Sequence, residues 1–240
     1  MKIYVKPEYK EIVNILEELA VSRSLRGVFD DLIELMAISI QTNFSSHENM
    51  CDKRMKRAAH ILNGYTFGEM KQIFSLSYKL EKLYVDNPFR DVLGELYTQL
   101  RFNNKSAGQI FTPHHISSFM TKTIISKEEI EEQIKKDVPF VAYDLAAGSG
   151  INILTACEYL DKNNIDYQKC FTGVCQEIDR ITALMCYISL TLNRCSAVIK
   201  IGDAAKDPYT SYSEEIEKGS DIWTTPAFNE NILKTVLGLK

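Results

Sequence analysis

The chain has 240 residues, and 28 Lys and Arg residues against 32 Asp and Glu residues give it a formal net charge of −4. Hydrophobic residues make up 45% and charged residues 25% of the sequence, as in ordinary soluble globular proteins, which excludes collagen-like, low-complexity and wholly disordered chains. No run approaches the roughly 18 apolar residues of a membrane span, and the first residues lack the apolar run of a secretory signal. We therefore expect a cytoplasmic protein of one or two small domains.

The charge distribution and the cysteines limit the sites that the chain can form. Residues 1–105 carry 15 basic and 14 acidic side chains, and residues 106–240 carry 13 basic and 18 acidic side chains. Neither part therefore has the excess of positive charge that a protein needs to bind DNA by itself. The sequence has no CxxC motif, which favours reduced, buried thiols over disulfides or a metal site. The six cysteines are Cys51, Cys157, Cys170, Cys175, Cys186 and Cys195.

Apolar residues in the first hundred positions recur at spacings of three and four, which predicts helices. The apolar stripes cover residues 12–19, 28–40, 73–83 and 92–100. Residues 42–49 (TNFSSHEN) form a predicted polar loop, and the basic cluster Lys53–Arg57 is interpreted as a solvated helix face rather than a phosphate site. We expect a helical domain over residues 1–105 and a second domain over residues 106–240.

After Lys105 the pattern changes to short β-rich runs that alternate with helical runs, which is typical of an α/β fold with a parallel sheet. The predicted strands cover residues 140–146, 171–177, 197–203 and 220–226. The predicted helices between them cover residues 151–160, 179–193 and 212–218, and a further helix begins at His114. We expect about four parallel strands in the order 3-2-1-4, with a ligand at their carboxyl ends.

Three chemical signals follow the predicted strands in order. Asp144–Gly150 (DLAAGSG) lies between a strand and a helix, where glycines let the backbone approach a ligand and the helix N-terminus favours an anion. Glu177 closes the second strand and is placed to bind ribose hydroxyls, and Asp203 closes the third. The alternatives are an ordinary strand-to-helix turn and solvated carboxylates at strand ends.

Four segments together resemble one enzyme family. Gly108–Pro113 (GQIFTP), Asp144–Gly150, Gln176–Asp179 (QEID) and Gly202–Asp203 stand in the order found in adenine-N6 DNA methyltransferases. The chain is similar to the methylation subunits of type I restriction-modification systems and their short relatives in phages and mobile elements. The resemblance covers residues 106 to about 230 and implies a truncated Rossmann-like sheet, S-adenosylmethionine as the cofactor and DNA as a partner. It also implies a specificity subunit or a second copy of the chain as an assembly partner.

The resemblance also assigns cofactor contacts to individual positions. It implies that the segment before the sheet lies against the methionine part, the glycine turn surrounds the amino-acid part, Glu177 binds the ribose, Ile178 packs on the adenine ring and Asp203 binds the adenine amino group. The matching positions are Gln109, Phe111, Thr112, Pro113, Asp144, Ala146, Gly148, Ser149, Gly150, Ile151, Glu177, Ile178, Asp203 and Ala204.

The fourth motif departs from the family pattern. Family members end the fourth strand with Asn or Asp, two prolines and an aromatic residue, whereas this chain has Thr225, Pro226, Ala227 and Phe228. The resemblance implies that Thr225, Pro226 and Phe228 hold a flipped adenine for methyl transfer to N6, but a threonine hydroxyl is a weaker acceptor than an Asn carbonyl. We therefore expect an adenine-N6 DNA methyltransferase with a degenerate catalytic motif. The alternatives are an inactive module that binds the cofactor or a protein partner, and methylation of RNA or protein.

Overall fold

A computed structural model describes residues 5–44, 48–104, 108–126, 128, 130, 132, 133 and 139–228. The chain divides into two compact units: Met1–Asn87 with Val92–Phe111, and Pro88–Asp91 with Thr112–Lys240. The domain boundary expected at residue 105 lies outside the described residues. Within the described ranges, no helix combines the length and apolarity needed to cross a membrane.

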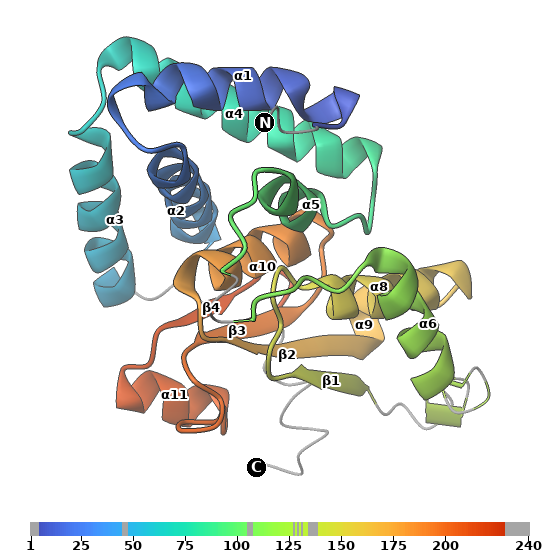
Figure 1. Ribbon diagram of the computed structural model, residues 1–240. Helices are drawn as coiled ribbons and strands as arrows, with labels where there is room; N and C mark the ends of the chain where they lie inside the picture. The colour runs from blue at the N-terminus through green and yellow to red at the C-terminus, as the bar shows by residue number, and fades with distance from the viewer. Residues whose placement is uncertain are drawn as a thin grey trace. The chain divides into compact units, whose positions relative to one another are not determined.

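The first unit is helical. Its helices are α1 (Lys10–Leu19), α2 (Leu25–Phe44), α3 (Glu48–Leu62), α4 (Phe67–Asp86) and α5 (Val92–Gln99), with 3₁₀ turns at Pro7–Tyr9 and Ala20–Ser22. Helices α1 and α4 lie side by side (Figure 1). They run antiparallel, because the Lys79 ammonium pairs with Glu11 at 2.6 Å while the Gln72 amide donates to Glu18 at 3.1 Å.

The apolar stripes of the sequence form the core of this unit, and the four expected helices are confirmed as α1, α2, α4 and α5. Helix α4 begins at a capping box, in which the Thr66 hydroxyl accepts from the Glu69 backbone N–H at 3.3 Å and the Glu69 carboxylate accepts from the Thr66 N–H at 2.7 Å. These bonds satisfy two donors that a helix start otherwise leaves without an intrahelical partner.

Helix α3 was not predicted by an apolar stripe, and its first residues fall in the stretch expected to be a loop. The basic cluster Lys53–Arg57 lies on this helix, but it is solvated only in part. Arg54 is 7% exposed, and the Arg57 guanidinium pairs with Glu34 of α2 at 2.6 Å. Two of the four basic residues therefore serve the packing of the unit.

The second unit contains a four-stranded sheet. Its strands are β1 (Phe140–Asp144), β2 (Phe171–Glu177), β3 (Ala197–Ile201) and β4 (Ile222–Thr224). Its helices are α6 (His114–Ile124), α8 (Ile151–Lys162), α9 (Tyr167–Cys170), α10 (Arg180–Leu192) and α11 (Tyr212–Lys218). The mostly parallel sheet confirms the α/β class.

The expected strand order 3-2-1-4 is wrong. The sheet has the order β1-β2-β3-β4, and β4 runs antiparallel beside β3, with Trp223 opposite Ile199. After α11 the chain reverses at Gly219, where φ is +70°, and returns along the nearest strand edge. This pairing buries the Trp223 indole completely, with its ring 5.2 Å from that of Tyr187 on α10, so local pairing and burial both favour the antiparallel arrangement.

The two faces of the sheet are covered differently. Helices α8 and α10 cover one face, and α11 with the loop before it lies on the other (Figure 1). A Cβ on Gly173 of β2 would meet the Ile153 side chain of α8 at 3.0 Å, so the glycine permits close helix packing. All seven residues of β2 are buried, as expected for a central parallel strand.

The prediction of unpaired thiols is confirmed for the cysteines whose side chains are described. Five cysteines are free, and four of these are buried: Cys157, Cys175, Cys186 and Cys195. Burial raises the pKa of the Cys157 thiol, which keeps it protonated and unreactive. The side chain of Cys51 lies outside the described residues.

Candidate functional site

The glycine turn and the ends of β2 and β3 meet at one edge of the sheet. One oxygen of the Glu177 carboxylate accepts from the Gly148 backbone N–H at 2.9 Å, and the other accepts from the Asp179 N–H at 3.0 Å. The Gly202 N–H donates to the Glu177 carbonyl at 2.9 Å. The glycine turn and the end of β3, which the sequence relates to Glu177 only by their order, thus both contact this residue, which is 9% exposed.

Both glycines of the turn adopt positive φ, +56° at Gly148 and +93° at Gly150. A Cβ on Gly150 would meet the Cys186 thiol of α10 at 2.9 Å, so this glycine is required for the backbone geometry of the turn and for helix packing. Gly150 is the N-cap of α8, and the N–H groups of a first helical turn lack partners within their helix and favour an anion.

Asp144 is the first residue of the glycine turn, and its side chain fixes the conformation of the turn. Its carboxylate accepts from the Ala146 N–H at 3.2 Å and from the Asn152 side-chain amide at 3.0 Å. Asn152 is oriented in turn by the Ser117 hydroxyl of α6, which donates to its amide oxygen at 2.7 Å. Asp144 is therefore a structural acceptor that links β1 to the start of α8.

Ser149 and Ile151 face the interior of the unit. The Ser149 hydroxyl is fully buried and donates to the Asp91 carboxylate at 2.5 Å, and Asp91 is itself 7% exposed. Ile151 is 3% exposed. The structure thus turns both side chains, which the resemblance placed around an amino-acid group, toward protein atoms, while the backbone of the turn stays at the edge of the sheet.

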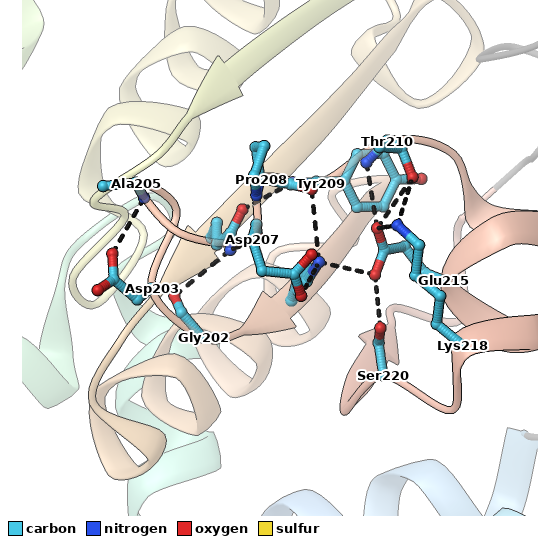
Figure 2. A network of polar contacts seen from close by, with 12 residues as sticks. Gly202, Asp203, Ala205, Asp207, Pro208, Tyr209, Thr210, Glu215, Lys218 and Ser220 are labelled. Atoms are coloured by element: carbon cyan, nitrogen blue, oxygen red, sulfur yellow. Dashed lines mark hydrogen bonds and ion pairs between the residues drawn. The ribbon is translucent and has the colours of Figure 1, made fainter.

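The loop after β3 carries Asp203. One oxygen of its carboxylate accepts from the Ala205 N–H at 3.0 Å (Figure 2). The other pairs with the Lys206 ammonium at 3.2 Å. The hydrogen bond from Lys206 and that from the Ala205 backbone lower the pKa of Asp203, so this side chain is an anionic acceptor at neutral pH. Ala204 lies between these residues and is partly exposed.

A buried polar network holds this loop on the sheet (Figure 2). The side chain of Gln176 is completely buried, and its amide donates to the Asp207 carbonyl at 2.8 Å and accepts from the Tyr209 N–H at 2.9 Å. Beside it on β3, the Lys200 ammonium pairs with Asp207 and with Glu215 of α11, each at 2.8 Å. The loop is thus fixed by two adjacent side chains on the same face of the sheet.

Glu215 is the centre of this network. Its carboxylate is 0% exposed and accepts from the Ser220 hydroxyl at 2.6 Å and from the Thr210 backbone N–H at 3.2 Å in addition to Lys200. Burial by itself would raise the pKa of Glu215, but the bonds from Lys200, Ser220 and Thr210 outweigh it and lower the pKa to about 2.

The GQIFTP segment spans the junction of the two units, since Gln109 and Phe111 belong to the first and Thr112 and Pro113 to the second. The Gln109 side chain accepts from the Asn104 N–H at 3.0 Å, and the Phe111 ring lies 5.4 Å from that of Tyr97. Pro113 is the N-cap of α6, with φ −62° and ψ 144°. Thr112 is partly exposed beside it.

The fourth motif lies at the other end of the sheet. Because β4 is antiparallel, Thr225 stands beside the start of β3: its hydroxyl donates to the Cys195 carbonyl at 2.7 Å and accepts from the Ala197 N–H at 3.0 Å. The five residues of β3, about 13 Å at roughly 3.3 Å per residue, separate this position from the edge that carries Glu177. Pro226 is exposed, and the Phe228 ring packs on Tyr212 at 5.3 Å. The structure does not bring these three residues to the glycine turn.

A model of the family described as N-6 DNA methylase matches residues 89–236, which is more than half of the chain. The chain belongs to the N-6 DNA methylase family. The matched range of this methylase-family chain contains the glycine turn, Glu177, the Asp203 loop and the fourth motif.

No curated protein matches this methylase-family chain. Among solved structures, it is similar to a Listeria monocytogenes protein described as a class I S-adenosylmethionine-dependent methyltransferase, with 13% sequence identity and a TM-score of 0.41. That match covers 86% of this chain and 57% of the other, so the chain spans little more than half the length of the Listeria protein.

The edge of the methylase-family sheet fits the cofactor that the family implies, S-adenosylmethionine. The Glu177 carboxylate accepts two backbone N–H bonds, and an ionised carboxylate has about four lone-pair sites, so capacity remains for ribose hydroxyls. Directly after it, Ile178 is 67% exposed, and Leu145 at the end of β1 is 54% exposed. A carboxylate acceptor together with exposed apolar side chains at one sheet edge is a composition that suits a nucleoside.

Sequence reasoning missed the residues that support this edge. Asp91 lies 58 positions before its partner Ser149, and Glu215 lies 15 positions after Lys200, so no local pattern connects them. A weak signal exists for Lys200, because a lysine between the apolar residues of a central strand requires a buried acidic partner.

Proposed function

We propose that the chain binds S-adenosylmethionine at the carboxyl edge of β1, β2 and β3, and that this site serves methylation of adenine N6 in DNA. The observation that carries the proposal is the Glu177 carboxylate, which is held against the glycine turn by the Gly148 N–H at 2.9 Å. Membership of the N-6 DNA methylase family supports the reaction and the target atom.

Each residue at this edge has a specific role in the proposal. Glu177 accepts hydrogen bonds from the ribose hydroxyls, Asp203 accepts one from the adenine amino group, and Ile178 packs against the ring. Bound S-adenosylmethionine supplies an electrophilic sulfonium methyl group, and transfer breaks its S–C bond, forms the N–C bond at N6 and releases a proton from that nitrogen. The acidic balance of the chain, with a net charge of −4, favours DNA binding together with a partner subunit over binding alone.

A second candidate is a module that binds the cofactor without turnover. The observation that favours it is Thr225, whose hydroxyl is buried between Cys195 and Ala197 at the amino end of β3. A group at that place cannot accept hydrogen bonds from an adenine positioned at the Glu177 edge. Loss of a positioned polar group at a transition state typically costs about 10² to 10³ in rate.

Isothermal titration with S-adenosylmethionine tests the site that both candidates share. We expect the wild-type chain to bind, Glu177→Ala to lose most of the affinity, and Glu217→Ala, at an exposed position on α11, to bind as the wild type does. Absence of binding by the wild type would exclude both candidates. Equal affinity in Glu177→Ala would show that the ribose is bound elsewhere.

Transfer of a labelled methyl group separates the two candidates. Incubation with mixed genomic DNA, followed by nucleoside analysis, should yield N6-methyladenine under the first candidate. A chain that binds the cofactor but labels no DNA supports the second, and label in RNA or protein instead of DNA would contradict the assignment of the substrate.

A further inference from the structure

Helix α4 has two apolar faces, and only one of them is covered. The covered face packs into the core of the first unit through residues that are at most 2% exposed: Ile73, Leu76, Leu80 and Tyr84. The second face is exposed over its whole length, at 73%, 59%, 68% and 77% for Phe67, Phe74, Tyr78 and Val85.

The exposed face forms a straight line along the helix. Successive members are seven, four and seven residues apart, which is the spacing of a coiled-coil seam. Lys71 and Glu81 fall on the same line, since at roughly 100° per residue all six positions lie within about 40° of one direction. We call this line the α4 seam: Phe67, Lys71, Phe74, Tyr78, Glu81 and Val85.

An exposed row of aromatic side chains differs from scattered exposed apolar residues. Single exposed residues are normal on a protein surface, whereas a contiguous row marks an interaction site. The flank of α4 is occupied by α1 through the pair of Lys79 with Glu11 at 2.6 Å, but the seam lies outside that contact. Lys71 stacks its ammonium 4.5 Å from the centre of the Phe67 ring, which holds the charge on the seam.

The seam is complementary to itself when reversed. Around Leu76 as the midpoint, an antiparallel copy places Phe67 opposite Val85, Lys71 opposite Glu81 and Phe74 opposite Tyr78. We propose that two copies of the chain associate through antiparallel α4 seams, with two Lys71–Glu81 ion pairs and two Phe74–Tyr78 ring contacts related by a twofold axis. A parallel pair would instead place each charge opposite its own kind, which costs affinity.

The area of the seam predicts a weak, reversible dimer. If a fully covered aromatic side chain buries about 200 Å², the exposed parts of Phe67, Phe74 and Tyr78 amount to roughly 400 Å² per copy. The two copies then bury about 800 Å² through aromatic side chains, at the low end of specific interfaces. We expect a dissociation constant in the micromolar range.

Sedimentation velocity of the full chain over a wide concentration range tests the association. The wild type should pass from monomer to dimer in the micromolar range. Lys71→Glu alone and Glu81→Lys alone should each weaken the dimer at least tenfold, because each variant faces two repulsive pairs. An equimolar mixture of the two variants should dimerise as the wild type does, since an antiparallel pair of unlike copies restores both ion pairs.

An apolar variant and a matched control complete the experiment. Phe74→Lys should abolish the dimer, and Phe44→Lys, at an aromatic residue 68% exposed on α2, should leave it unchanged. All these side chains are exposed, so circular dichroism should show the same fold in every variant. A wild type that stays monomeric at high concentration would overturn the proposal, as would mixed charge variants that associate no better than each alone.

Discussion

Among single residues of the second unit, the buried pair of Lys200 and Glu215 has the largest expected effect on stability. Removing one member of a buried ion pair leaves the other charge without compensation. We predict that Lys200→Met lowers the free energy of unfolding by about 3 kcal/mol in urea denaturation, because Glu215 is 0% exposed and Lys200 is only 1% exposed.

The matched control is Lys218→Met, which removes a second lysine near Glu215, at 3.5 Å, whose side chain is 45% exposed. We expect this change to cost less than about 1 kcal/mol. The double variant Lys200→Met with Glu215→Met should be more stable than Lys200→Met alone, because no charge remains buried. A loss in Lys218→Met as large as in Lys200→Met would contradict the assigned burial.

Glu215 also predicts how stability depends on pH. Its pKa is lowered in the folded chain from the usual 4.5 to about 2, so its contribution to stability is complete above pH 4.5 and is lost as the pH falls toward 2. We predict that the free energy of unfolding declines less between pH 5.5 and pH 3 in Glu215→Gln than in the wild type. Glu217→Gln, at an exposed position, should decline as the wild type does, and identical slopes for all three chains would refute the ionised pair.

At the scale of elements, the antiparallel placement of β4 makes Thr225 a structural residue. Thr225 is 3% exposed, and its hydroxyl bridges the Cys195 carbonyl and the Ala197 N–H. We predict that Thr225→Val lowers the free energy of unfolding by about 1 to 3 kcal/mol, since two buried backbone groups lose a partner. The affinity for S-adenosylmethionine, measured by titration, should not change.

The control for this change is Thr224→Val at the half-buried position next to it, which we expect to alter stability by less than about 0.5 kcal/mol. If β4 instead ran parallel beside β1, Thr225 would reach the edge of Glu177. Thr225→Val would then reduce cofactor affinity or turnover with little loss of stability.

The elements differ in how far their sequences determine them. The run FTGVCQE predicts β2 over residues 171–177 and the structure has the same bounds, because a central strand needs apolar residues on both faces. The run around Trp223 predicts a strand equally well, but a strand's sequence does not state which neighbour it pairs with. Helix α3 escaped prediction because its described buried side chains mix Arg54 with Ala58 and Ile61, so no long apolar stripe marks the helix in the sequence.

The same limit applies to the site. Strand ends and the glycine turn predict that Gly148 and Glu177 come together, since parallel strands end at one edge. The bond between Ser149 and Asp91 depends on a segment that enters the second unit from before α5, and only the folded chain reveals it. Sequence therefore predicts the acceptors at the edge better than the residues that hold them in place.

At the scale of the whole molecule, the division into two compact units predicts that ligand binding stabilises them unequally. A ligand that binds only the folded form at one hundred times its dissociation constant adds about 2.7 kcal/mol. We predict that S-adenosylmethionine raises the free energy of hydrogen exchange in β2 and α10 of the second unit by about this amount. Exchange in α2 of the first unit should not change. Native-state hydrogen exchange measures the protection of each unit, and Glu177→Ala is the control. Equal protection of the two units would contradict a cofactor site confined to the edge of the sheet.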